Sequence, residues 1–139
     1  MVDVNASTRV RTRHTELSLE EIASLLPGTG ELMASVARSF GSAWYAAEGG
    51  NWELAAYFVR RVQGQLRALA VVRPRYRGSI EAFQEEALVP LLRAIDRQDR
   101  DAFERAYEAA VERADRYHAE AGHPYIRWRR PLHPLEIFV

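Results

Sequence analysis

The residues best suited to chemistry lie close together towards the C-terminal end of the chain. Asp115 and His118, and again Glu120 and His123, are each an acidic residue followed three positions later by a histidine. On a helix this spacing places both side chains on one face, as in the di-metal sites of helical bundles. Such a site needs these pairs on two different helices. Here one helix carries both pairs and is expected to end at Gly122, so we expect no metal site.

His118 has two interpretations. A neutral imidazole is a common ligand of haem iron, so His118 could be the axial ligand of a haem that is held without covalent bonds. Alternatively, His118 lies at the edge of an apolar helix stripe and hydrogen-bonds to a neighbour. The bulky ring of Tyr117 beside it would, on the core side, fill part of the space that a haem needs. This neighbour favours the structural interpretation.

Aromatic residues near the ends of the expected helices are candidates for a second kind of site. Trp44, Trp52, Phe58 and Tyr117 could line a pocket for a small apolar ligand. Aromatic residues at helical spacing are also typical of a packed core, and that alternative stays open.

Several classes of enzyme lack their essential residues in this sequence. The chain has no cysteine, which excludes disulfides, thiolate metal sites, thiol nucleophiles and covalent thioether attachment of haem. It contains no glycine-rich phosphate loop, and no spacing of Ser, His and Asp indicates a catalytic triad. We therefore expect a protein that is not an enzyme.

The elements that must position these residues are expected to be helices. Apolar residues recur at helical spacing in four long segments, and no segment alternates with period two for long enough to predict a sheet. These segments cover about 31–47, 51–72, 79–95 and 101–122. Their matched lengths and short links are typical of an antiparallel up-down-up-down four-helix bundle, so we expect an all-α fold.

Local signals predict where these helices begin and bend. Ser18 and Glu21 form a capping box for a short helix before the first long one. Asn51 and Asp101 are the expected N-caps of the second and fourth long helices. Pro90 lies inside the third helix and is expected to kink it, because proline lacks the N–H that a helix interior needs.

The chain of 139 residues fits a single domain. We expect a flexible N-terminal segment over 1–17, the four-helix bundle over 18–126 and an extended tail over 127–139. Three apolar residues are expected to anchor the tail: Trp128, Ile137 and Phe138.

Three stretches resemble a known family. They are Gly50–Tyr57 (GNWELAAY), Asp99–Tyr107 (DRDAFERAY) and Ala114–Ile126, in which Ala-Asp-Arg-Tyr-His is followed by Ala-Gly-His-Pro-Tyr-Ile. Together they resemble a family of small bacterial helical proteins similar to cytochrome c-prime, over about residues 31–131. In that family the last helix ends in Cys-x-x-Cys-His, followed by a Gly-x-Pro-aromatic-Ile tail.

The chain departs from this family at the haem-binding motif. Ala114 and Tyr117 stand where the family has its two cysteines, and only His118 remains. The resemblance therefore implies a haem-free cytochrome c-prime-like bundle without a cofactor. The alternative is a sensor or electron carrier that binds haem non-covalently through His118.

Composition limits the partners. The 19 basic residues, all of them Arg, balance 19 acidic residues, so no net field favours nucleic acid or an anionic membrane. No run approaches the ~18 apolar residues of a membrane span, and the polar N-terminus is no secretory signal. If Met1 is the native start, we expect a cytoplasmic protein. Bundles of the type that the chain resembles commonly pair through exposed helix faces, so the resemblance implies a homodimer. We expect it to act by binding or self-association, with a small apolar ligand as one option.

Overall fold

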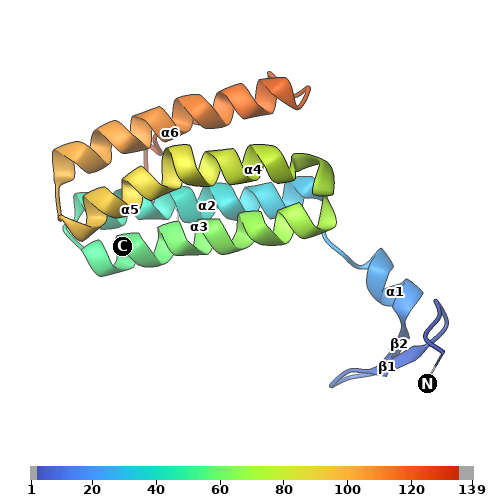
Figure 1. Cartoon of the computed structure of the whole chain (residues 1–139). Coiled ribbons are helices and arrows are strands. Elements are labelled where there is room, and N and C mark those ends of the chain that lie inside the picture. The colour runs from blue at the N-terminus through green and yellow to red at the C-terminus, as the bar shows by residue number, and fades with distance from the viewer. Residues whose placement is uncertain (1–2, 135–139) are drawn as a thin grey trace.

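The computed structural model describes residues 3–134 and is mostly helical (Figure 1). Its elements in chain order are β1 (Arg9–Arg11), β2 (Glu16–Ser18), α1 (Leu19–Ser24), α2 (Thr29–Glu48), α3 (Trp52–Val72), the 3-10 turn η1 (Pro74–Tyr76), α4 (Arg77–Phe83), the π-helical stretch η2 (Gln84–Leu88), α5 (Val89–Asp96) and α6 (Arg100–Glu120). We call residues 3–28 the N-terminal arm, 29–120 the helical body and 121–134 the tail. The prediction of a mainly helical fold is confirmed.

A small β-hairpin in the N-terminal arm was not predicted. β1 and β2 pair antiparallel, with Val10 opposite Leu17, and Arg11 lies 3.9 Å from the carboxylate of Glu16. The expectation of no sheet was wrong because each strand has only three residues, too few to show a period of two. The described part of the segment 1–17, which was expected to be flexible, contains most of this hairpin.

Two of the predicted N-caps are confirmed. The hydroxyl of Ser18 accepts a 3.0 Å hydrogen bond from the backbone N–H of Glu21, whose carboxylate accepts one of 2.7 Å from the N–H of Ser18. These two bonds are the predicted capping box, and α1 begins directly after Ser18. At the start of α3, the side-chain oxygen of Asn51 accepts a 3.2 Å hydrogen bond from the N–H of Leu54.

The predicted N-cap of the last helix was two residues too late. Asp99, not Asp101, accepts a 3.0 Å hydrogen bond from the N–H of Ala102. Gln98, with a φ of 50°, lies between α5 and α6. The next residue, Asp99, has the extended backbone that is typical of an N-cap, and α6 begins directly after it. Asp101 lies in the first turn of α6, where its negative charge suits the helix dipole.

The third long helix departs from α-helical geometry just before Pro90. α4, η2 and α5 follow one another without a break, and η2 is a π-helical stretch that ends two residues ahead of Pro90. In an unbroken α-helix the N–H of residue 90 would donate to the carbonyl of Glu86, and proline has no N–H. The guanidinium of Arg113 from α6 donates a hydrogen bond to that carbonyl instead.

The core of the helical body is aromatic and centres on Tyr107, which is fully buried. Its ring stacks on Phe40 at 4.2 Å and lies 5.0 Å from Trp44 and 5.9 Å from Phe103. Its hydroxyl donates a 3.0 Å hydrogen bond to the backbone carbonyl of Phe40. These contacts hold α6 against α2.

The tail returns along the helical body and packs on α2. The indole of Trp128 lies 5.0 Å from the ring of Phe40, which confirms its predicted role as an anchor. Further along, the hydroxyl of Tyr45 donates a 3.1 Å hydrogen bond to the carbonyl of Pro131. The other two predicted anchors lie outside the described residues: Ile137 and Phe138.

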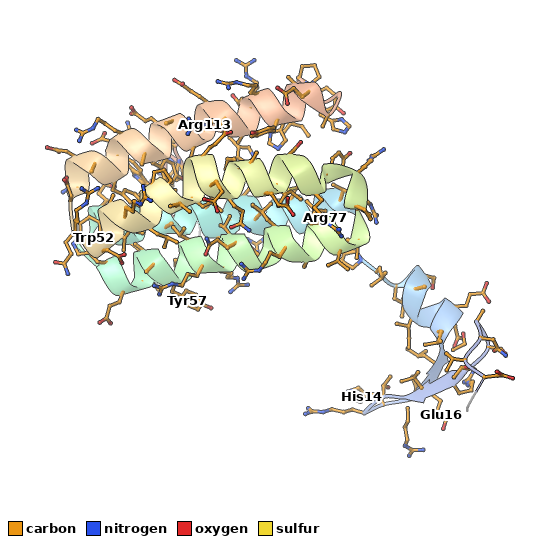
Figure 2. All side chains as sticks on the ribbon, viewed as in Figure 1. His14, Glu16, Trp52, Tyr57, Arg77 and Arg113 are labelled. Atoms are coloured by element: carbon orange, nitrogen blue, oxygen red, sulfur yellow. The ribbon has the colours of Figure 1, made fainter. Side chains whose placement is uncertain are left out.

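The N-terminal arm extends away from the end of the helical body at which α2 begins (Figure 1). Figure 2 shows that the labelled His14 and Glu16 of the arm lie far from the labelled residues of the body. None of the described helices is long and apolar enough to cross a membrane.

Candidate ligand-binding cavity

A cavity of about 560 Å³ lies at the end of the helical body where α2 and α4 begin and α3 and α6 end. In Figure 1 this is the end from which the N-terminal arm leaves, and there α6 diverges from α4. The tail, through Trp128, forms part of the wall. The cavity is therefore built by segments far apart in the sequence.

Most of the wall consists of apolar side chains. Helices α2, α3 and α4 contribute Met33, Val36, Leu66, Leu69, Ile80 and Phe83. Small residues on the facing helices α2 and α6 leave the space between them: Ala34, Ala37 and Ala114. No described Asp or Glu lines the cavity, so its walls favour an apolar ligand over a cation.

His118 is the polar residue of most interest in this wall. Its ring is half-buried and meets the indole of Trp128 edge-on at 5.8 Å. Its Nδ1 is buried and has no hydrogen-bond partner among the described residues. Burial lowers the pKa of His118 below its usual 6.5; the charge of Asp115 opposes this shift and His123 adds to it. The imidazole is therefore neutral at pH 7.

The carboxylate of Asp115 binds the tail. One carboxylate oxygen accepts a 2.6 Å hydrogen bond from the backbone N–H of Trp128, and the other lies 3.3 Å from Nε of Arg127. These contacts hold the tail against α6 beside His118. The ring of His123 instead pairs with the hydroxyl of Tyr125 at 2.8 Å.

The two acidic-residue–histidine pairs thus form no common site. The described part of the chain contains no group of three or more His, Asp or Glu placed to hold a metal ion. Helix α6 ends at Glu120, before His123, so the second pair does not lie on one continuous helix face. This agrees with the expectation that Gly122 follows the helix end, where its φ is 87°.

Tyr117 also lines the cavity. Its ring lies edge-on to Phe83 at 6.4 Å, and its hydroxyl donates a 3.3 Å hydrogen bond to the carboxylate of Glu86. Burial and the negative charge of Glu86 raise the pKa of this phenol. Tyr117 therefore connects α6 to α4 and narrows one side of the cavity.

The structure does not bring the four predicted pocket aromatics together. Trp44 and Trp52 lie at 6.3 and 6.2 Å from the ring of Phe103, near the opposite end of the body, and Phe58 is buried in the core. None of these three lines the cavity, whereas Tyr117 does. Their helical spacing reflects core packing, which was the alternative interpretation.

Sequence reasoning missed most of the cavity wall. Met33, Leu66 and Phe83 belong to apolar stripes that look the same whether they face a packed core or a space. The one usable signal was the set of small residues, Ala34, Ala37 and Ala114, on helices that face each other. That signal is informative only once the pairing of the helices is known.

No family model, no curated protein and no solved structure matches this chain. The resemblance to cytochrome c-prime therefore stays a prediction from the sequence.

Proposed function

We propose that this protein binds a small apolar ligand in the cavity beside His118, and that it acts by binding rather than by catalysis. The observation that supports this most directly is a half-buried histidine with an unpartnered Nδ1 in a mostly apolar wall. Ligand pockets are typically ~300–1,000 Å³ and combine apolar walls with a few polar groups. Here the cavity is about 560 Å³ and His118 supplies such a group.

The neutral state of His118 defines the kind of ligand. Because burial lowers the pKa of its ring, the contact that it offers at pH 7 is a hydrogen bond and not an ion pair. A buried nitrogen without a partner is rare in proteins, and a ligand hydroxyl or amide that reaches it after the ring turns towards the cavity would supply the missing hydrogen bond. The matching ligand is a largely apolar molecule with one neutral hydrogen-bonding group.

Titration with the neutral fluorescent probe N-phenyl-1-naphthylamine tests this function. We expect saturable binding of one probe per chain. Ala121, directly after the end of α6, lines the cavity and is exposed, whereas Ala119, in the last turn of α6, is an exposed alanine that does not line it. Ala121→Trp should place a large ring at the mouth and weaken binding at least tenfold, while Ala119→Trp should leave it unchanged. Equal binding by both variants, or no saturable binding at all, would argue against this site.

Non-covalent haem is the second candidate ligand, and one observation favours it. His118 is a neutral imidazole in an apolar cavity, which is what an axial ligand requires. Haemin should then give a sharp Soret band that saturates at one haem per chain and disappears in His118→Ala. A broad spectrum that is the same for both proteins would leave the apolar ligand as the sole candidate. Tyr117 occupies part of this wall, which weighs against haem.

We also propose that the helical body is an antiparallel up-down-up-down four-helix bundle. The support is that α4, η2 and α5 follow one another without a break and so count as one helix beside α2, α3 and α6. The kinship with cytochrome c-prime, a homodimeric state and a cytoplasmic location remain predictions from the sequence.

A further inference from the structure

A second cavity, of about 500 Å³, lies between α2 and the tail. Three arginine side chains belong to its wall: Arg38 from α2, and Arg127 and Arg129 from the tail. No described Asp or Glu lines it. We call it the arginine cavity. Its wall is therefore positively charged, whereas the wall of the cavity beside His118 is mostly apolar.

The arginines of the tail have hydrogen-bond donors left for a ligand. The side chain of Arg127 is 77% exposed, and its Nε lies 3.3 Å from the carboxylate of Asp115. A guanidinium carries five N–H donors, so this ion pair does not occupy all of them. Arg129 is exposed and forms no ion pair with a carboxylate of residues 3–134. On α2, the acidic Glu31 precedes the cavity and is not part of its wall.

The arginine cavity and the cavity beside His118 are neighbours, because Ala34, Ala37 and Trp128 line both of them. The indole of Trp128 stands between the two. It lies 5.0 Å from the ring of Phe40, which lines the arginine cavity, and 5.8 Å from the ring of His118, which lines the other. Ala34 is exposed and carries only a methyl group. A ligand chain can therefore pass from one cavity to the other over Ala34, beside the indole.

The two walls together match one kind of molecule. An apolar chain is favoured beside His118, where no described carboxylate or arginine lines the wall. At the other end of such a chain, an anionic group would reach the guanidiniums. Arginine binds carboxylate and phosphate groups through charge-assisted, often bidentate hydrogen bonds, which are stronger than neutral ones. The neutral group that pairs with His118 then lies at the end of the chain away from the arginines.

We infer that the ligand of this protein is a long-chain organic anion, whose apolar chain fills the cavity beside His118 and whose anionic group is held by Arg38, Arg127 and Arg129 in the arginine cavity. The inference rests on the proposed function and adds to it the charged group and the cavity that binds that group. Removing the charge, from the ligand or from the protein, should then weaken binding without abolishing it.

Two probes with the same chain and the same hydroxyl test this inference: ω-hydroxydodecanoate and its uncharged methyl ester. Each is titrated against N-phenyl-1-naphthylamine bound to the full chain, and the ratio of the two affinities is the measure. We expect the acid to bind about tenfold more tightly than the ester. In Arg129→Gln the preference should fall to about twofold or less, because the unpaired guanidinium is lost.

Arg116→Gln is the matched control, because Arg116 is an exposed arginine of α6 that lines neither cavity. This variant should keep the wild-type preference for the acid. Arg129→Gln should bind the fluorescent probe and the ester as the wild type does, which shows that its apolar cavity is intact. Added salt should reduce the preference in the wild type, since ions screen the charges of exposed guanidiniums.

The proposed function and this inference fail in different ways. If neither the fluorescent probe nor the ester binds, the proposed function is wrong and the inference falls with it. If both bind but the acid has no advantage over the ester, the inference alone is overturned. An advantage of the acid that persists in Arg129→Gln would overturn it as well, because the anionic group would then be bound elsewhere.

Discussion

The guanidinium of Arg113 donates a hydrogen bond to the backbone carbonyl of Glu86. It also lies 3.5 Å from the carboxylate of the same residue. That carbonyl is the one to which residue 90 would donate in a regular α-helix, and residue 90 is proline. A side chain from α6 therefore supplies a hydrogen-bond donor at the point where the helix formed by α4, η2 and α5 departs from α-helical geometry.

Replacing Arg113 should destabilise the protein measurably. Arg113→Ala removes both contacts with Glu86, and we expect the free energy of unfolding to fall by about 0.5–1.5 kcal/mol. Urea unfolding followed by circular dichroism measures this change. Arg116→Ala, an exposed arginine on the same helix, is the control and should change the value by less than about 0.5 kcal/mol. Equal effects would show that the contact with Glu86 contributes nothing specific.

The hydroxyl of Tyr107 should contribute to stability separately from its ring. Tyr107→Phe keeps the stacking on Phe40 but removes the buried 3.0 Å hydrogen bond to the carbonyl of that residue. The carbonyl loses a partner in a dry environment, so we expect a loss of about 1–2 kcal/mol in urea unfolding. Tyr45→Phe removes a hydroxyl that binds the tail in a less buried place, and its effect should be smaller. The reverse order would contradict the central role of Tyr107.

Acid should destabilise the protein through His118. Its folded-state pKa lies below the usual 6.5 because the ring is partly buried. Below pH 6.5 the unfolded chain then binds more protons than the folded one, so stability falls as the pH drops towards the folded pKa and is unaffected above 6.5. Between about pH 7.5 and about pH 5, wild type should lose more stability in urea unfolding than His118→Gln does.

The matched comparison for this pH effect is His14→Gln, which changes an exposed histidine of the N-terminal arm. This variant should follow the wild-type dependence of stability on pH. An identical pH dependence in wild type and His118→Gln would mean that the buried ring does not resist protonation.

Asp115 should control how firmly the tail is held. Asp115→Ala removes the 2.6 Å hydrogen bond from the N–H of Trp128 and the ion pair with Arg127. Trypsin should then cleave after Arg127 and Arg129 several-fold faster, which mass spectrometry of the intact chain follows over time. Glu112→Ala, an exposed acidic residue on the same helix, should not change the rate. Equal cleavage of both variants would show that the tail is held elsewhere.

Local signals allowed a good part of the fold to be predicted. The capping box of Ser18 and Glu21 and the cap at Asn51 depend only on residues within one helical turn, and both form as expected. Asp101 was predicted as the cap of the last helix, although Asp99, two residues earlier, is the same residue type. The backbone at Gln98 decided between them.

The candidate site was much less predictable. His118 and Tyr117 were identified because their residue types are suited to binding, and both line the cavity. Trp44, Trp52 and Phe58 were chosen for the same reason, but Trp44 and Phe58 are buried in the core and Trp52 packs against it. A helix stripe shows that a residue faces inward but does not show whether it faces another side chain or a space.

The sequence by itself determined the helical segments, the N-caps at Ser18 and Asn51 and the exclusion of any thiol chemistry, because these depend on residue types and on spacings of a few positions. Only the tertiary structure decided that Asp115 holds the tail, that Arg113 donates a hydrogen bond to the carbonyl of Glu86 and that a cavity lies beside His118. Each of these depends on which faces of distant segments meet. That choice follows from the packing of the whole body and is not encoded in any short stretch of the chain.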